Sequence, residues 1–348
     1  MQKTIALIFG GEGAERRISE RSAANVIEKI QGKLDFITIG IDAFGSWFLF
    51  DGEKDEIESG EWINSEKKTP VYPARFNGES GFFTSDGRII KADLAFPILH
   101  GDFGEDGVIQ GALRCAHIAY IGSDVFPSAL SSDKAFTKII AEYLGIPTLP
   151  WFIPKDENPR DARREAERRL GYPFFIKPRE LGSSIGASPV YSKRDFKPAY
   201  DEAMRVSRGR IMIESFANVK LELELGLFDD GKRRFISNPG VIYSSGKFYS
   251  YSAKYDADES PETTATASLD LSTVRKTRSM AKRLADFLGL GNISRIDFFM
   301  TPDGEIYFNE INSIPGMTKT SLYPEITELY GRLSGTLFEA LLNGAPIL

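Results

Sequence analysis

A predicted β-hairpin near the C-terminal end limits what this chain can be, because its strands carry charged residues. Two β-rich runs, residues 293–300 and 306–312, flank Thr301-Pro302-Asp303-Gly304, a sequence that favours a tight type I turn between antiparallel strands. Residues two apart in a strand share a face. We therefore expect Arg295 and Asp297 to point the same way. The second strand is expected to present four residues together, namely Ile306, Phe308, Glu310 and Asn312.

Three oxygen-bearing side chains of this hairpin, Asp297, Glu310 and Asn312, can converge if its two faces meet at the open end. Oxygen ligands without His or Cys suit a hard cation such as Mg²⁺, which completes its shell with waters and substrate phosphates. The plainer alternative is a set of solvated polar residues on an ordinary antiparallel sheet. Gly316, just downstream, favours a binding site, because a glycine lets backbone N–H groups approach a ligand closely.

Length and composition indicate a globular protein of two or three domains. The chain has 348 residues, too many for one ordinary core, and it has no run of about 18 apolar residues. Its one cysteine, Cys115, excludes an internal disulfide framework, agrees with a reducing cytoplasm, and is predicted to be buried in a helix. No signal peptide is expected, and a net charge of −6 gives no support to sequence-independent nucleic-acid binding.

The first 122 residues have the pattern of a parallel-sheet domain. An apolar strand at residues 4–9 leads through a glycine-rich turn into a helix, with Ser19 as its expected cap, and a β-rich run follows. The glycine spacing does not match the dinucleotide fingerprint, so we do not expect NAD binding. His100 follows a buried strand, at the edge where open α/β sheets bind ligands. It is a site candidate, with a surface histidine in a turn as the alternative.

The composition changes after Gly122, where we place a domain boundary. A strand at residues 172–177 ends in Lys177, and the loop containing Gly182, Ser183 and Ser184 follows. Small residues in such a loop can cover phosphates, because their N–H groups and hydroxyls donate hydrogen bonds. The Walker A order is absent, and a plain glycine hairpin remains the alternative.

Two further segments precede the hairpin. The strand at residues 220–228 carries acidic residues at 222 and 224 on one face, a pattern that usually faces solvent. Residues 254–270 are rich in Asp, Glu, Ser, Thr and Ala, which predicts a surface loop or lid.

Five sequence blocks contain most of the candidate site residues. The blocks are Gly10-Gly11-x-x-Ala14-Glu15-x-x-Ile18-Ser19; His100-Gly101-x-x-Gly104-Glu105-Asp106-Gly107-x-x-Gln110-Gly111; Lys177-Pro178 with Gly182-Ser183-Ser184-x-Gly186; Arg295-x-Asp297-Phe298; and Asn309-Glu310-x-Asn312-x-x-Pro315-Gly316-Met317-Thr318 with Ser321. Together they resemble the D-alanine:D-alanine ligase family of the ATP-grasp superfamily. The second and fifth blocks are specific within that superfamily, since carboxylases and glutathione synthetases share the lysines and metal carboxylates without the HGxxGEDGxxQG loop.

The resemblance implies an α/β (α+β) ATP-grasp fold in three domains. Residues 1–122 would form a Rossmann-like domain on the first-substrate side, residues 123–218 a small central α+β subdomain, and residues 219–348 a mixed-sheet subdomain with the metal site. ATP would lie between the last two. A cytoplasmic homodimer acting on small molecules is implied, with no membrane or nucleic-acid partner.

The resemblance also implies roles for individual residues. ATP would contact Lys134, Lys177, Ser183, Ser184, Glu214 at the adenine end, Glu222 at the ribose, and Lys254. Two Mg²⁺ ions, replaceable by Mn²⁺, would be held by Asp297, Glu310 and Asn312. The D-alanines would contact Glu15 through the ammonium, His100 near the carboxyl group, Arg295 and the Gly316 amide at the oxyanion, Ser321 through the second carboxylate, and Leu322. Tyr255 would bond toward Glu15 and Ser183.

The implied activity is ATP-dependent ligation of two D-alanines through an acyl phosphate, for peptidoglycan synthesis. A D-alanine:D-serine or D-alanine:D-lactate ligase of the same fold is the nearest alternative, and a non-catalytic nucleotide-binding protein is the alternative of another class. Two departures from the family pattern bear on these choices. Thr320 stands where many relatives have His, and the turn at residues 218–221 lacks the usual Gly. The apolar Leu322 favours D-alanine as second substrate.

Overall fold

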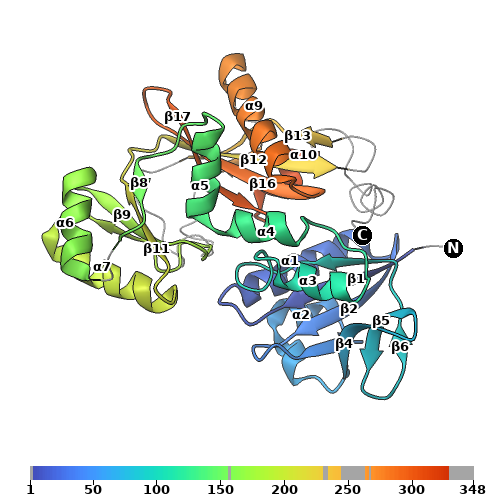
Figure 1. Cartoon of the computed structure of the whole chain (residues 1–348). Helices are drawn as coiled ribbons and strands as arrows, with labels where there is room; N and C mark the ends of the chain where they lie inside the picture. Colours follow the sequence, from blue (N-terminus) through green and yellow to red (C-terminus); the bar gives the residue numbers. More distant parts are fainter. Residues whose placement is uncertain (1–2, 156–157, 230–233, 244–262, 266–267, 329–348) are drawn as a thin grey trace.

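Three β-sheets organise the protein, shown as a computed structural model in Figure 1. The structure describes residues 3–155, 158–229, 234–243, 263–265 and 268–328. Within these ranges the sheets have seven, four and six strands. The first sheet, in blue and cyan, lies beside the third, in yellow and orange, and the second sheet projects from one side with its green and yellow-green helices. The predicted α/β architecture is confirmed.

The first sheet is mainly parallel at its centre. Strand β1 pairs in parallel with β2 on one side and β7 on the other, as the predicted βαβ unit requires. Antiparallel strands then extend the sheet beyond β2. Its order is β6 (Ile89–Ile90), β5 (Glu79–Thr84), β4 (Lys68–Phe76), β3 (Trp47–Phe50), β2 (Asp35–Ile41), β1 (Thr4–Gly10) and β7 (Leu94–Pro97).

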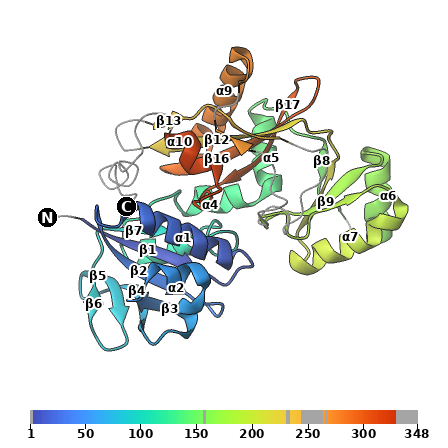
Figure 2. The same ribbon diagram turned by 180° about the vertical axis from the view of Figure 1, so that it is seen from behind.

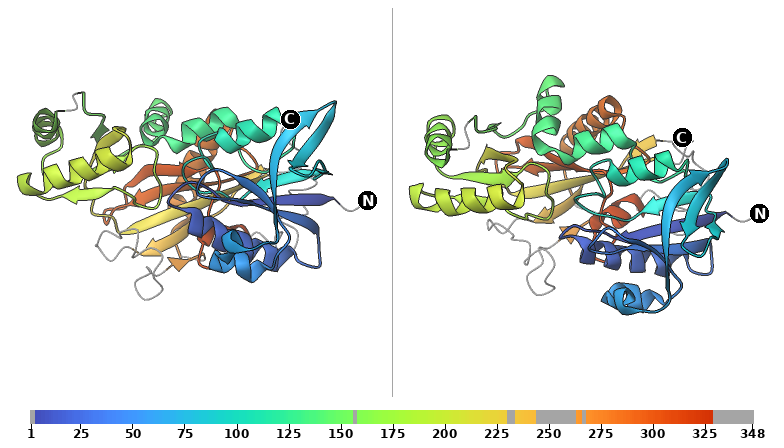
Figure 3. Two further views of the ribbon diagram at one scale, coloured as in Figure 1. Left: turned by 90° about the horizontal axis from the view of Figure 1, so that it is seen from below. Right: turned by 60° about the horizontal axis from the view of Figure 1, so that its bottom comes forward.

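Alternation along β1 supplies two cores, because successive strand side chains point to opposite faces. Ile5, Leu7 and Phe9 pack with α1 (Arg16–Ile30), α2 (Lys54–Ser59) and the 3₁₀ turn η1 (Glu61–Asn64). Ala6 and Ile8 pack with α3 (Val108–Cys115) on the other face. Figure 2 shows α1 and α2 from behind, and Figure 3 shows the blue helices and the green helices on opposite sides of the sheets.

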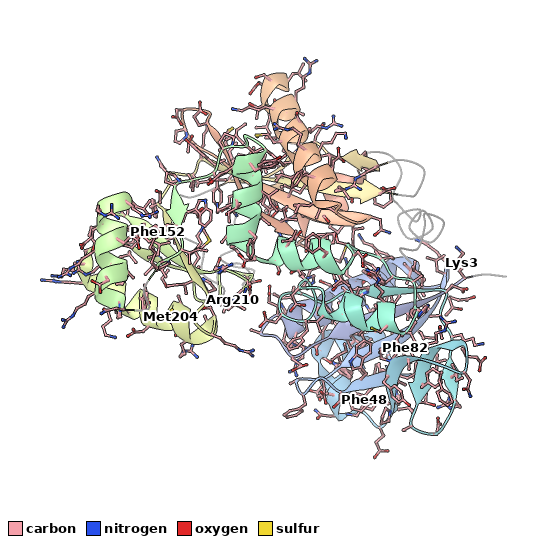
Figure 4. The ribbon with its side chains drawn as sticks, viewed as in Figure 1. Lys3, Phe48, Phe82, Phe152, Met204 and Arg210 are labelled. Carbon is pink, nitrogen blue, oxygen red and sulfur yellow. The ribbon has the colours of Figure 1, made fainter. Side chains whose placement is uncertain are left out.

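The second sheet is small and antiparallel. Its order is β10 (Ser188–Val190), β9 (Phe174–Pro178), β11 (Ile211–Ser215) and β8 (Trp151–Phe152). Helices α6 (Pro159–Arg169) and α7 (Lys193–Val206) cover one face, and Phe174, Ile176 and Ile213 form the core beneath them. Figure 4 labels Phe152 in this body, and Phe48 and Phe82 in the first.

The third sheet holds the predicted hairpin. Its order is β15 (Thr263–Thr264), β14 (Gly240–Tyr243), β12 (Leu221–Asp229), β16 (Ile293–Met300) and β17 (Ile306–Asn312), with β13 (Arg234–Ile236) also paired to β12. The turn forms as predicted, since Gly304 N–H bonds to the Thr301 carbonyl at 2.9 Å. The helices here are α4 (Val125–Ser132), α5 (Lys134–Tyr143), α9 (Leu271–Leu288) and α10 (Leu322–Glu328).

Two local predictions were wrong. Cys115 is exposed, because the buried side of α3 is formed by Ile109, Gln110 and Leu113, and residues two apart face different sides of a helix. Ser19 is not a helix cap, because α1 begins earlier, with Glu15 at its N-cap. The buried Ser19 hydroxyl instead accepts the Gly10 N–H at 2.8 Å and donates to the Ile98 carbonyl, which joins the ends of β1 and β7.

Within the described part of the chain, no helix has both the length and the apolar composition that crossing a membrane requires.

Candidate active site

A cavity of about 640 Å³ lies where the three sheets meet. Its walls include Glu15 at the start of α1, Lys177 on β9 and Glu310 on β17, one residue from each sheet region. Two predicted site residues, Lys254 and Tyr255, lie outside the described residues. All the others line this cavity: Glu15, His100, Lys134, Lys177, Ser183, Ser184, Glu214, Glu222, Arg295, Asp297, Glu310, Asn312, Gly316, Ser321 and Leu322.

A β-bulge in the hairpin turns its acidic residues toward the cavity. Asp297 pairs with Glu310 but the next residue, Phe298, pairs with Phe308, which leaves Asn309 as an extra residue in β17. The extra residue reverses the alternation of side chains. Phe308, like Ile306, therefore packs in the core, whereas Glu310 and Asn312 line the cavity. The prediction that these four residues share one face was wrong, and the convergence arises from the bulge.

The three oxygen-bearing side chains form a connected group. Asn312 Nδ2 donates to Asp297 Oδ2 at 3.0 Å, and Asp297 lies opposite Glu310 in the ladder. Among the described residues there is no group of three or more His, Cys, Asp or Glu side chains suited to a metal. A metal bound at the hairpin would therefore also need the amide oxygen of Asn312. Two carboxylates and an amide are hard donors that fit Mg²⁺.

Cations of the protein balance both carboxylates. Arg295 makes two hydrogen bonds to Asp297, from Nε at 2.9 Å and from Nη2 at 2.8 Å. Lys134 Nζ lies 3.2 Å from Glu310 Oε2. A divalent cation bound to these carboxylates would weaken their pairing with Arg295 and Lys134. The two cationic side chains would then be available to anionic groups of a ligand.

Arg295 has a second acidic neighbour, because its Nε lies 3.4 Å from Glu224 Oε2. Burial opposes the charge of the guanidinium, but Asp297 and Glu224 raise the pKa of Arg295 well above its usual value. The prediction that acidic residues 222 and 224 face solvent was wrong. Glu222 and Glu224 on strand β12 instead line the cavity, and Glu224 is buried.

The lysines of the cavity are held by defined partners. Lys134 Nζ donates to the Leu181 carbonyl at 2.8 Å, which links α5 to the loop that precedes Ser183. Lys177 Nζ donates to Glu214 Oε2 at 2.5 Å. Burial alone would raise the pKa of Glu214, but the lysine charges around it lower that pKa below its usual value. Glu214 is therefore an ionised carboxylate within the protein.

Glu15 and the serine loop are in contact. Ser183 Oγ donates to Glu15 Oε1, and Ser183 and Ser184 both have positive φ angles, of 51° and 61°. Burial raises the pKa of Glu15, more than Ser183 and Lys134 lower it. Gly101 leaves room for this carboxylate, since a Cβ there would lie 2.3 Å from Glu15 Oε2.

His100 is buried, and its Nε2 lies 3.2 Å from the Ser22 hydroxyl. Burial lowers the pKa of His100 to about 4, so the imidazole is neutral at neutral pH. It can serve a substrate carboxylate as a hydrogen-bond partner, but not as a permanent cation.

The loop after β17 closes the other end of the cavity. Ser321 Oγ accepts the Thr318 N–H at 3.1 Å, and a Cβ at Gly316 would lie 2.9 Å from Ser321 Oγ. Leu322 is buried at the first position of α10. Gly316, Ser321 and Leu322 thus form one compact wall.

Two family descriptions cover most of the sequence. "D-ala D-ala ligase N-terminus" matches residues 4–123, and "D-ala D-ala ligase C-terminus" matches residues 140–343. The chain belongs to the D-alanine:D-alanine ligase family. The predicted resemblance, the ATP-grasp fold and the ligase class are confirmed.

Relatives of this ligase match it over nearly its whole length. The D-alanine–D-alanine ligase of Clostridium novyi is 33% identical over 350 residues, which cover 99% of this chain and 98% of the relative. That of Ruminiclostridium cellulolyticum is 36% identical over 359 residues, covering 98% and 94%. The VanG D-Ala:D-Ser ligase from Enterococcus faecalis has a TM-score of 0.86 at 34% identity, covering 99% of both chains. The Coxiella burnetii D-alanine-D-alanine ligase has a TM-score of 0.82 at 27% identity, covering 98% and 93%.

Two charged residues of this ligase had no predicted role: Glu105, which belongs to the second sequence block, and Lys138. Glu105 accepts the Gly101 N–H at 3.1 Å and the Ile314 N–H at 3.2 Å, so it joins two loops of the cavity. Loss of solvent, and then the nearby Glu15, raise the pKa of Glu105 to about 8. Lys138 lies one turn after Lys134 on α5 and contacts Glu214. The i, i+4 spacing of the two lysines was the available signal.

Proposed function

We propose that this enzyme joins two D-alanine molecules into D-alanyl-D-alanine at the expense of ATP, for peptidoglycan precursor synthesis. The observation that carries the proposal is that one cavity is lined by Lys134 and Lys177, by three hard oxygen donors, and by Arg295 and Gly316. Lysines and metal-binding oxygens serve phosphoryl transfer, and hydrogen-bond donors for an oxyanion serve acyl transfer. The names of the relatives support the same reaction.

At the nucleotide end, Lys134 and Lys177 would bind the phosphates, and the loop with Ser183 and Ser184 would cover them. Glu214 would lie at the adenine end and Glu222 at the ribose. Both lysines lie on the cavity wall with acidic partners, so they are held in place before ATP arrives. Lys254 would complete this set.

Asp297, Glu310 and Asn312 would hold Mg²⁺, in two positions, with Mn²⁺ as a substitute. When bound, the metal would neutralise charge on the transferred phosphoryl group. The hard oxygen donors and their convergence at the bulge support this assignment.

At the amino-acid end, Glu15 would bind the ammonium of the first D-alanine, and neutral His100 would donate to its carboxylate. That carboxylate attacks the γ-phosphorus of ATP, ADP leaves, and an acyl phosphate forms. The amine of the second D-alanine, held through its carboxylate by Ser321 beside Leu322, then attacks the acyl carbon. Arg295 and the Gly316 amide would stabilise the tetrahedral oxyanion, after which phosphate leaves. Tyr255 would connect Glu15 and Ser183.

A product assay tests the proposal. The purified protein, ATP and Mg²⁺ should release phosphate only when D-alanine is added, and the product should be D-alanyl-D-alanine. Phosphate release that requires a different amine or carboxylate would contradict the substrate assignment. A protein that binds ATP without turnover under any of these conditions would instead be the non-catalytic alternative.

A second candidate, a D-alanine:D-serine ligase, is favoured by one observation, the fold match to the VanG D-Ala:D-Ser ligase. The buried, apolar Leu322 favours D-alanine. Competition between D-alanine, D-serine and D-lactate at several pH values separates the possibilities, because an amine must lose its proton to attack whereas a hydroxy acid has no amine to deprotonate.

We also propose that the protein is a cytoplasmic homodimer. Each subunit would have three domains, at residues 1–122, 123–218 and 219–348. The strands of the three sheets fall within these three ranges, which supports the division, while helices α4 and α5 of the second range pack on the third sheet. Light scattering on the purified protein tests the dimer, and limited proteolysis near residues 122 and 218 tests the boundaries.

A further inference from the structure

Glu214 is a fully buried carboxylate with two lysine partners. Lys138 Nζ lies 2.5 Å from its Oε1, and Lys177 Nζ lies 2.5 Å from its Oε2. The three side chains come from different elements, because Glu214 is on β11, Lys177 on β9 and Lys138 on α5. The group therefore brings one carboxylate and two lysine amino groups together where solvent has little access. Burial lowers the pKa of Lys138, and the charge of Glu214 opposes that shift.

The two lysines differ in their access to the cavity. The side chain of Lys177 is 16% exposed and lines the cavity, where a ligand can reach it. That of Lys138 is 2% exposed and does not line the cavity. Lys138 Nζ also donates to the Phe308 carbonyl of β17 at 3.4 Å. One lysine can exchange partners, and the other is enclosed between the second and third sheets.

This difference matters for the proposed binding of ATP. A phosphate that attracts Lys177 competes with Glu214 for the same ammonium group. If Lys177 were the sole cation beside Glu214, its movement toward a phosphate would leave a buried carboxylate unpaired, which is strongly unfavourable. A second, enclosed cation removes most of that cost, because Glu214 stays paired.

We propose that Lys138 is a positioning residue that keeps Glu214 paired while Lys177 turns to the phosphates of ATP. The proposal rests on the proposed nucleotide binding and adds a residue to it. Lys134, one turn earlier on α5, lines the cavity and contacts Glu310, whereas Lys138 does not line it and contacts Glu214 and the Phe308 carbonyl. Helix α5 thus places Lys134 at the cavity, where a ligand can reach it, and Lys138 beside Glu214 in the protein interior.

Substitution of Lys138 tests the proposal. Lys138→Met should raise the Kd for ADP, measured by calorimetry, by roughly tenfold or more, because Glu214 then retains Lys177. It should raise the KM for ATP more than it lowers kcat. The matched control is Lys197→Met, which removes an exposed lysine paired with Asp201 on α7 and should leave ADP binding unchanged. An unchanged Kd in a folded Lys138→Met protein would overturn the proposal.

A double variant separates this role from general packing. In the Glu214→Gln background the buried charge that retains Lys177 is absent, so adding Lys138→Met should change the Kd for ADP by less than about twofold, whatever Glu214 itself contributes to nucleotide binding. If Lys138→Met raises the Kd as much in the Glu214→Gln background as in the wild type, Lys138 does not act through Glu214, and the proposal is wrong.

A measurement on the unmodified protein keeps the test independent of folding defects. Nuclear magnetic resonance of ¹³C-labelled lysines should show the Lys177 side-chain signal shifting as ADP is added, with Lys138 nearly unchanged. An equal shift of both signals would contradict the proposal. A wild-type protein that binds neither ADP nor ATP would contradict the proposed function instead, which is a distinct result.

Discussion

The two charged walls of the cavity carry similar residues in different settings. On the β9–β11 side, Glu214 is fully buried, and the enclosed Lys138 holds it. On the hairpin side, the side chains of Asp297 and Glu310 are 11% and 24% exposed, and their cationic partners also line the cavity. Burial therefore separates a charge that maintains the wall from charges that can exchange partners with a ligand.

The largest effect is expected on the hairpin side of the cavity, where the charged side chains can exchange partners with a ligand. Glu310→Gln should lower the rate of D-alanine-dependent phosphate release by at least about 10²-fold, because it removes a proposed metal ligand at the reacting phosphate. The midpoint of thermal unfolding should change little, since this side chain faces the cavity. Glu305→Gln, at an exposed position in the same hairpin, is the matched control and should keep full activity. A fully active Glu310→Gln protein would remove the metal assignment.

A smaller effect is expected at Glu224, a buried carboxylate that contacts a cation of the cavity wall. Glu224 is buried but contacts Arg295, the proposed oxyanion donor, at 3.4 Å. Glu224→Gln should lower kcat roughly tenfold, because Arg295 loses the acidic partner that would hold it when a metal shares Asp297. The KM for ATP should change less than kcat. Equal changes in both constants would indicate a disturbed nucleotide site and contradict this role for Glu224.

His100 extends the comparison to a buried group that is neutral at neutral pH. Its folded-state pKa of about 4 lies below the value of about 6.5 expected in the unfolded chain, so the unfolded state binds the proton more readily. The free energy of unfolding should therefore fall as the pH drops from about 6.5 toward 4, by up to about 1.4 kcal/mol per pH unit.

Denaturant titrations at several pH values measure this dependence. His100→Gln should flatten the stability profile between pH 6.5 and 4, whereas His117→Gln, at an exposed position, should leave it unchanged. An identical profile for His100→Gln would show that the buried imidazole is not responsible.

The smallest effect is expected at Glu222, which lines the cavity and is proposed to contact the ribose. Glu222→Gln should raise the KM for ATP only a few-fold, because one hydrogen bond to a neutral group contributes about 1 kcal/mol. Adenosine triphosphate and its 2′-deoxy analogue should then bind this variant with more similar KM values than they do the wild type. A variant that keeps the full preference of the wild type would place the ribose elsewhere.

The family and the fold class were predictable because local patterns carry them. The apolar strand at residues 4–9, the turn at Gly304 and the charged hairpin obey rules that operate within a few residues. Fourteen of the predicted positions, together with Leu322, line one cavity. Most of them belong to the five blocks, whose spacing is local, whereas Lys134, Glu214 and Glu222 were assigned from the family resemblance alone.

Two of the errors have a common physical origin in contacts between distant segments. Ser19 was assigned to a helix cap but joins two strand ends, and residues 222 and 224 were assigned to solvent but face the cavity. Their surroundings are supplied by residues far away in the chain, which periodicity cannot reveal.

The sequence by itself determined the elements, the turn and the family, because propensity, alternation and motif spacing are local properties. Tertiary structure alone decided which charged side chains a ligand can reach and which are enclosed by protein. One extra residue, Asn309, reverses the strand alternation and turns Glu310 and Asn312 to the cavity. The packing of α5 between two sheets encloses Lys138 beside Glu214. Both results depend on the register and burial of distant segments, and these exist only in the folded chain.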